Sequence, residues 1–119
     1  MSDPVADAAR TAGATLAAEL GSGLPADVEA ALYVRQVGDG RPSQYVDPVS
    51  LAGLIVAIAT LAWTVYSDLR KRVPEPAQET VVRQVRMTLR DSGELLPPQA
   101  GRITEVVVTE VIKAVRADE

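Results

Sequence analysis

Residues 49–66 contain no charged side chain, and this run, VSLAGLIVAIATLAWTVY, constrains the fold more than any other part of the 119-residue sequence. As an α-helix, 18 residues extend about 27 Å at a rise of 1.5 Å per residue. The hydrocarbon core of a bilayer is about 30 Å thick. Asp47 is a suitable N-cap, and Pro48 suits the first helical position. The sequence therefore predicts one long apolar helix over about residues 48–70.

The charges around this run favour a membrane-spanning helix. Arg70, Lys71 and Arg72 follow it, whereas residues 1–48 contain three basic and seven acidic residues. Because basic residues are retained on the cytoplasmic side, this asymmetry predicts a single-pass protein of the bacterial cell membrane with a cytoplasmic C-terminus. The same three residues are candidates for contact with anionic lipid headgroups. The side chains expected to drive insertion are Leu54, Ile55, Ile58, Leu61 and Trp63.

The composition of the run leaves two other interpretations open. Many of its residues are Ala, Thr, Gly or Ser, which contribute little to insertion or oppose it. In the first alternative the chain is a soluble, cytoplasmic α-helical homo-oligomer, and the run is its core or a dimer seam. In the second it is a small membrane-active toxin, because small residues such as Gly53 and Ala57 permit close pairing of helices in lipid.

The N-terminal part of the chain also predicts helices. Apolar residues recur at helical spacing from Pro4 to Leu20, with Asp3 as a plausible N-cap and Gly21 at the end. The apolar face of this segment is mostly alanine, so it needs a partner surface to be stable. Residues 24–37 predict a second helix, with a strand at 31–34 as the alternative.

Two amphipathic stretches near the C-terminus, residues 77–90 and 101–116, predict a helical hairpin. Apolar and polar residues also alternate over 81–90, so a strand is an alternative there. Two helices of this size bury little surface alone, so we expect another protein or a second copy to dock on them. The expected interaction face consists of Val82, Val85, Leu89, Val107 and Val111.

The expected fold is therefore mainly α, and the chain divides into three regions. Residues 1–44 form an N-terminal helical region and loop, residues 45–72 the apolar helix with its basic flank, and residues 73–119 the hairpin.

The composition excludes several kinds of chemistry. With no Cys and no His, the chain has no disulfide, no thiol nucleophile, no Cys/His zinc site and no imidazole base. It contains no glycine-rich phosphate loop and no GxSxG motif. The sequence thus predicts a non-enzymatic accessory or adaptor protein, without catalytic residues, metal or cofactor.

Nucleic acid is not an expected partner. The net charge is -4, and one Trp, three Tyr and no Phe leave little aromatic surface for stacking on bases. Arg83, Arg86 and Arg90 form a basic stripe beside the apolar face of their segment. We interpret this stripe as a solvated helix face, with anionic lipid as the functional alternative.

The stretch YVDPVSLAGLIVAIATLAWTVYSDLRKR, followed by PEPAQETVVRQVRMTLR and ITEVVVTEVIKAV, resembles a group of small actinobacterial proteins of uncharacterised function. That group is associated with accessory components of bacterial conflict or signalling systems. The resemblance covers about residues 45–115 and brings no catalytic residue with it. It implies an accessory or adaptor protein rather than an enzyme.

Overall fold

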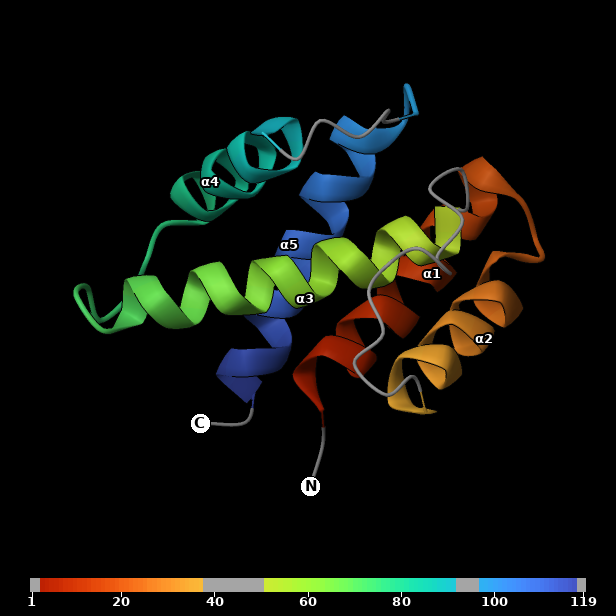
Figure 1. Ribbon diagram of the computed structural model, residues 1–119, viewed down its shortest axis with the longest axis horizontal. Helices are drawn as coiled ribbons and strands as arrows, with labels where there is room; N and C mark the ends of the chain where they lie inside the picture. Colours follow the sequence, from red (N-terminus) through yellow and green to blue (C-terminus); the bar gives the residue numbers. More distant parts are fainter. Residues whose placement is uncertain (1–2, 38–50, 92–96, 118–119) are drawn as a thin grey trace.

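The computed structural model describes residues 3–37, 51–91 and 97–117, and over these ranges the chain forms five α-helices and no strand (Figure 1). The helices are α1 (Pro4–Leu20), α2 (Leu24–Val37), α3 (Leu51–Arg70), α4 (Gln78–Asp91) and α5 (Ala100–Ala117). The predicted mainly α fold with one long apolar helix is confirmed. The segments for which a strand was the alternative lie in α2 and α4. Asp47 and Pro48, the predicted start of the apolar helix, lie outside the described residues.

Helix α1 begins and ends at the residues that the sequence predicts. The Asp3 side chain accepts a hydrogen bond from the Val5 N–H at 3.0 Å, and Pro4 lies in the first turn. At the other end, Gly21 has a φ of 128° and donates its N–H to the Ala17 carbonyl at 2.9 Å. A side chain would be strained at this φ, so glycine suits the position.

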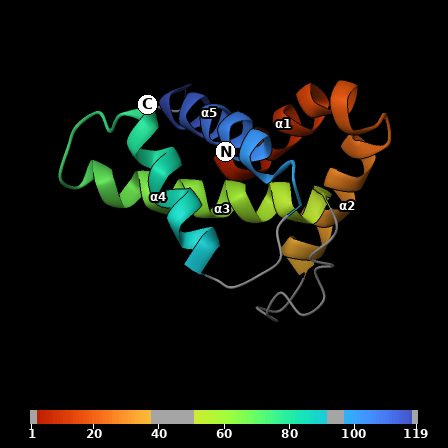
Figure 2. The ribbon, with the colours of Figure 1, turned by 90° about the horizontal axis from the view of Figure 1, so that it is seen from above.

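Helix α3 lies in the middle of the fold and contacts all four other helices (Figures 1 and 2). Helices α1 and α2 precede it in the chain, whereas α4 and α5 follow it. Helices α1 and α5 also pack against each other, and theirs is the most extensive contact between any two of the described helices. The first and the last described helices therefore contact each other as well as α3.

One face of α3 is buried against these neighbours. Its buried residues are Ala52, Gly53, Ile55, Val56, Ile58, Ala59, Ala62 and Tyr66. The opposite face carries Ala57, Trp63 and Thr64, which are exposed. Among the described residues, α3 is the one helix long and apolar enough to cross a membrane by length and composition, and half of its most apolar window is buried inside the domain.

The small residues of α1 allow its backbone to approach the neighbouring helices closely. Its buried face comprises Val5, Ala6, Ala8, Ala9, Ala12, Gly13 and Leu16. A Cβ atom placed on Gly13 would lie 2.9 Å from Cγ2 of the buried Val28 in α2. The chain itself thus supplies the partner surface that this alanine-rich helix requires.

An ion pair on the surface also joins α1 to α2. The Arg10 Nε–H donates a hydrogen bond to the Glu29 carboxylate. This hydrogen bond, and then the negative charge of Glu29, raises the pKa of the Arg10 guanidinium above its ordinary value. Both side chains are about half exposed, so the apolar contacts beneath them contribute most of the stability.

The close approach at Gly13 predicts that Gly13→Ala destabilises the domain. Overpacking against Val28 costs about 1–3 kcal/mol, which outweighs the gain of up to about 1 kcal/mol in helix propensity. The free energy of unfolding, measured in urea by circular dichroism at 222 nm, should fall by roughly 1 kcal/mol.

Gly101→Ala is the matched control. A Cβ atom there would come no closer than 4.0 Å to the Arg86 guanidinium, so the same change should leave stability equal or slightly raised. Equal effects of the two substitutions would contradict the close α1–α2 contact.

Candidate functional site

The five residues expected to drive membrane insertion do not share one face of α3. Ile55 and Ile58 are fully buried in the core of the domain, and Leu54 and Leu61 are half-buried. Trp63 is exposed over 41% of its surface. Two of these side chains are therefore covered by other helices of the same chain, and three reach its surface to different degrees.

The three basic residues that follow the apolar run lie at the C-terminal end of α3 and just beyond it. The Arg70 guanidinium lies 5.8 Å from the centre of the Tyr66 ring. Lys71 lies 3.8 Å from the Asp68 carboxylate, and Arg72 is exposed. These side chains form an exposed basic turn between α3 and α4.

The residues of the expected interaction face are largely inside the domain. Val85, Val107 and Val111 are fully buried, whereas Val82 and Leu89 are half-buried. The first three pack α4 and α5 onto the rest of the chain. A surface that binds a partner on this hairpin must therefore consist mostly of other residues.

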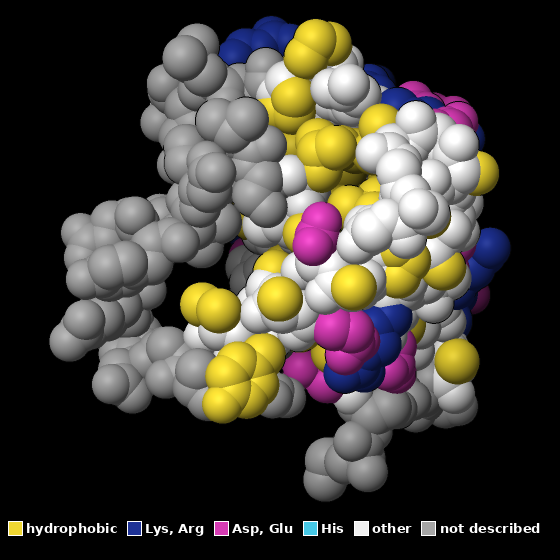
Figure 3. Space-filling view, turned by 90° about the vertical axis from the view of Figure 1, so that its right-hand side faces the viewer, with side chains coloured by type: hydrophobic (Ala, Val, Ile, Leu, Met, Phe, Trp, Pro, Cys, Tyr) yellow, Lys and Arg dark blue, Asp and Glu magenta, His cyan; other side chains and the backbone are white. Residues whose placement is uncertain are grey.

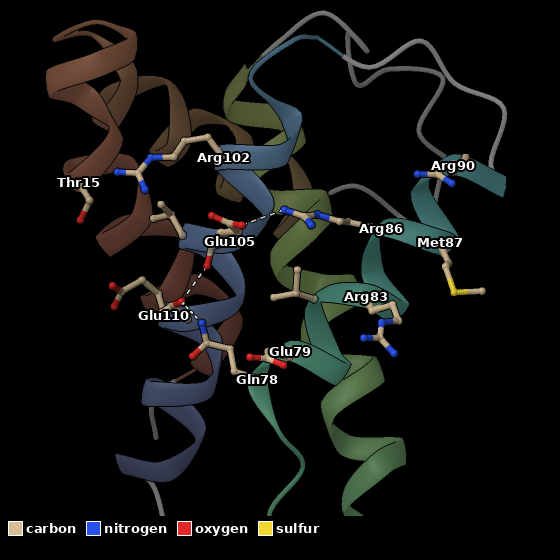
Figure 4. Close-up of a pocket in the computed structure, with 13 residues that line it drawn as sticks. Thr15, Gln78, Glu79, Arg83, Arg86, Met87, Arg90, Arg102, Glu105 and Glu110 are labelled. Atoms are coloured by element: carbon tan, nitrogen blue, oxygen red, sulfur yellow. Dashed lines mark hydrogen bonds and ion pairs between the residues drawn. The ribbon is translucent and has the colours of Figure 1, made fainter.

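An open groove with a volume of about 940 Å³ lies between α4 and α5 (Figure 4). Its lining is a mixture of arginine, glutamate, other polar and apolar side chains. The lining residues are Thr15, Gln78, Glu79, Val82, Arg83, Arg86, Met87, Arg90, Arg102, Glu105, Val106, Thr109 and Glu110. The predicted arginine stripe and Val82 belong to this lining, so the groove is the candidate functional site.

The residues of α5 that line the groove were not predicted from the sequence. The 3.6-residue period shows which residues of α5 are polar, but not which polar residues turn toward α4. That depends on how α5 packs on α1 and α3, and no local pattern reports it.

Hydrogen bonds and ion pairs cross between the two walls of the groove. The Arg86 guanidinium donates to the Glu105 carboxylate at 3.0 Å, and the Gln78 amide donates to the Thr109 hydroxyl at 2.8 Å. Both pairs are drawn as dashed lines in Figure 4. They connect α4 to α5 along the groove.

Arg102, at the N-terminal end of α5, is tied to α1 instead. Its Nε–H and one terminal N–H group each lie 3.3 Å from an oxygen of the Glu19 carboxylate. This ion pair bridges residues 83 positions apart in the sequence and links the C-terminal end of α1 to the N-terminal end of α5.

Arg83, Met87 and Arg90 lie on the α4 side of the groove, and the side chains of Arg83 and Met87 extend away from α5 in Figure 4. Met87 is 50% exposed. Within residues 3–37, 51–91 and 97–117, neither arginine forms an ion pair with an acidic side chain. This part of the groove therefore offers two available cations beside an exposed apolar side chain.

The described residues contain no group of three Asp or Glu side chains placed to hold a metal ion. Every buried side-chain nitrogen or oxygen among them has a hydrogen-bond partner. The buried Thr104, for example, donates to the Ala100 carbonyl at 2.7 Å. The groove is thus an open surface with a mixed lining of charged, polar and apolar side chains.

Exposed apolar residues elsewhere are scattered over separate elements. Tyr33 and Val34 lie on α2, and Val73 lies in the turn after α3. On the side of the molecule that carries α2, hydrophobic side chains lie among other side chains and backbone, and acidic and basic side chains gather in a group below them (Figure 3). Single exposed apolar residues are normal on protein surfaces, so these positions do not mark a second site.

No protein family, curated protein or solved structure matches this chain. The resemblance to small actinobacterial accessory proteins therefore stays a prediction from the sequence.

Substitutions at Arg102 and its neighbour Ile103 compare how much a polar and an apolar contact of α5 each contribute to the free energy of unfolding. Arg102→Ala removes an exposed ion pair and should lower the free energy of unfolding by less than about 1 kcal/mol. Ile103→Ala leaves a cavity in the core and should lower it by about 2–5 kcal/mol. Urea unfolding of both variants measures the difference. A larger loss for Arg102→Ala would mean that the ion pair, and not apolar burial, holds α5 in place.

Proposed function

We propose that this protein is a soluble, non-enzymatic α-helical adaptor. In this proposal α3 is the core helix of the domain, and the groove between α4 and α5 binds another polypeptide. In this proposal the protein is located in the cytoplasm, which is the alternative that the sequence leaves open to the predicted membrane location.

The observation that carries the proposal is the contact between α1 and α5. If α3 crossed a bilayer, residues 1–44 and 73–119 would lie on opposite sides of a hydrocarbon core about 30 Å thick. Helices α1 and α5 could not then pack on each other, nor could Arg102 reach Glu19. Helices from both sides of the apolar run instead cover the same face of α3, as expected for the central helix of a soluble bundle.

The composition of the groove supports the adaptor role. Arginine and methionine are enriched at protein interfaces, and Met87 adds a flexible apolar side chain to an arginine-rich surface. The side chains of Arg86 and Glu105 remain about half exposed although they are paired. A polypeptide laid in the groove can therefore reach both polar and apolar groups.

Ala57→Asp and Ala59→Asp distinguish a core helix from a membrane span. Ala57 is exposed, whereas Ala59 is fully buried two residues further on. In the soluble domain, Ala57→Asp should lower stability by less than about 1 kcal/mol, mainly through helix propensity. Ala59→Asp buries an unpaired carboxylate and should unfold the domain. In a membrane span both positions lie near the bilayer centre, and Asp costs about 2.5–3.5 kcal/mol of insertion energy at either.

The measurement is fractionation of bacterial lysates, followed by circular dichroism of the purified chains. We expect the wild type and Ala57→Asp to be soluble without detergent and equally helical, and Ala59→Asp to be unfolded or aggregated. A wild-type chain that stays in carbonate-washed membranes, with insertion reduced equally by both substitutions, would contradict the proposal.

A further inference from the structure

Three residues of α4 form a stripe on its exposed side. Arg83, Met87 and Arg90 are spaced i, i+4 and i+7, which places them on one face of the helix. The two arginines are about 10 Å apart along the helix axis at 1.5 Å per residue. Met87 lies between them with half of its surface exposed. We call these three residues the Arg–Met–Arg stripe.

The two arginines of the stripe form no ion pair with the described residues of the chain. The other two arginines of the groove are paired, Arg86 with Glu105 and Arg102 with Glu19. In the described part of the chain, Arg83 and Arg90 have no such partner. The whole chain has a net charge of -4, so the two positive charges of the stripe are opposite in sign to the net charge of the protein.

Helix stability alone does not explain the stripe. Arg90 lies in the last turn of α4, where a cation interacts favourably with the helix dipole. Arg83 lies in the middle of the helix, where that effect is absent, and Met87 is apolar. Helix α4 packs only on α3 and α5 among the described helices, so its opposite side is free to contact another molecule.

We propose that the groove binds an acidic amphipathic helix of a partner protein, seated on the Arg–Met–Arg stripe. This inference rests on the proposed adaptor function and names the chemistry of its partner. Two carboxylates seven residues apart on the partner helix match the spacing of Arg83 and Arg90. An apolar residue between those carboxylates packs on Met87. Recognition of an amphipathic helix in a groove, through residues spaced one and two helical turns apart, is a recurring mode of binding.

The glutamates of the groove favour a polypeptide over a nucleic acid. Glu79, Glu105 and Glu110 line the same groove as the arginines. A phosphate backbone carries a negative charge at every nucleotide and would meet these carboxylates, whereas a helix can place its two carboxylates opposite the two available arginines alone.

The test uses a fluorescein-labelled helical peptide, built mainly from Ala and Gln, with Glu at two positions seven residues apart and Leu between them. Binding to the full-length protein is measured by fluorescence anisotropy at low and physiological salt. We expect Arg83→Glu/Arg90→Glu to raise Kd at least about tenfold, because both contacts become repulsive. Met87→Ala should also raise Kd while the circular dichroism spectrum stays unchanged.

Lys71→Glu/Arg72→Glu is the matched control, because it changes the net charge equally at two exposed residues outside the groove. We expect its Kd to stay within about twofold of the wild type. A peptide with Lys in place of both Glu residues should bind Arg83→Glu/Arg90→Glu more tightly than it binds the wild type, which excludes misfolding as the cause of lost binding.

Three results would overturn the inference. The first is an equal rise in the Kd of the acidic peptide for the groove variant and the control variant, and the second is no measurable binding of this peptide to the wild type. The third is displacement of the bound peptide by a DNA oligonucleotide that binds more tightly. In each case a protein that is soluble without detergent would still be consistent with the proposed function. A protein extracted from membranes only by detergent would instead reject the proposed function, and fractionation reveals this before any peptide is added.

Discussion

The burial of one face of α3 by helices from both ends of the chain is the constraint on which the rest of this structure depends. Ile55, Ile58 and Tyr66 have almost no exposed surface, because α1 and α2 cover part of this face and α4 and α5 cover the rest. An apolar helix of 20 residues needs either lipid or other apolar helices around it. Here the chain provides the helices, and their mutual contacts close the domain.

This closure also determines where a binding surface can form. Helix α5 is held by α1 and α3 on its apolar side, so its polar side turns toward α4 and lines the groove. Helix α4 has only Val81 and Val85 fully buried, which anchor it to α3 and α5. Apart from the half-buried Val82 and Leu89, the remainder of α4 is exposed, and this is why an arginine stripe with a methionine in it lies at the surface.

Much of the fold could be predicted from the sequence because the signals for helices are local. Asp3 and Gly21 delimit α1 through hydrogen bonds to residues close in the sequence, and the period of apolar residues predicts the other helices. The 81–90 segment was ambiguous because its residues satisfy both periods. Burial of Val81 and Val85 along one side of a helix resolves it, since a four-residue spacing suits a helix face.

The candidate site could be predicted only in part, because it depends on contacts between distant residues. Arg83, Arg86 and Arg90 are visible as a stripe, but the pairing of Arg86 with Glu105 depends on how α5 packs. From the sequence alone, either a partner or the chain itself could cover the apolar Val107 and Val111. In the folded chain, its own helices cover both residues. For α3, length and apolarity are alike in a membrane span and in a core helix, so the sequence alone does not distinguish the two.

The most direct test of the central claim is the proximity of α1 and α5 in the cell. The chain has no cysteine, so Glu19→Cys/Arg102→Cys carries only two thiols, at positions whose native side chains meet at 3.3 Å. Intact cells are treated with a short, membrane-permeant bismaleimide, and the intramolecular cross-link is detected by mass spectrometry. The account predicts an efficient cross-link within one chain. Failure to form it, with one thiol modified only from the cytoplasm and the other only from outside, would place α3 across the membrane and contradict the account.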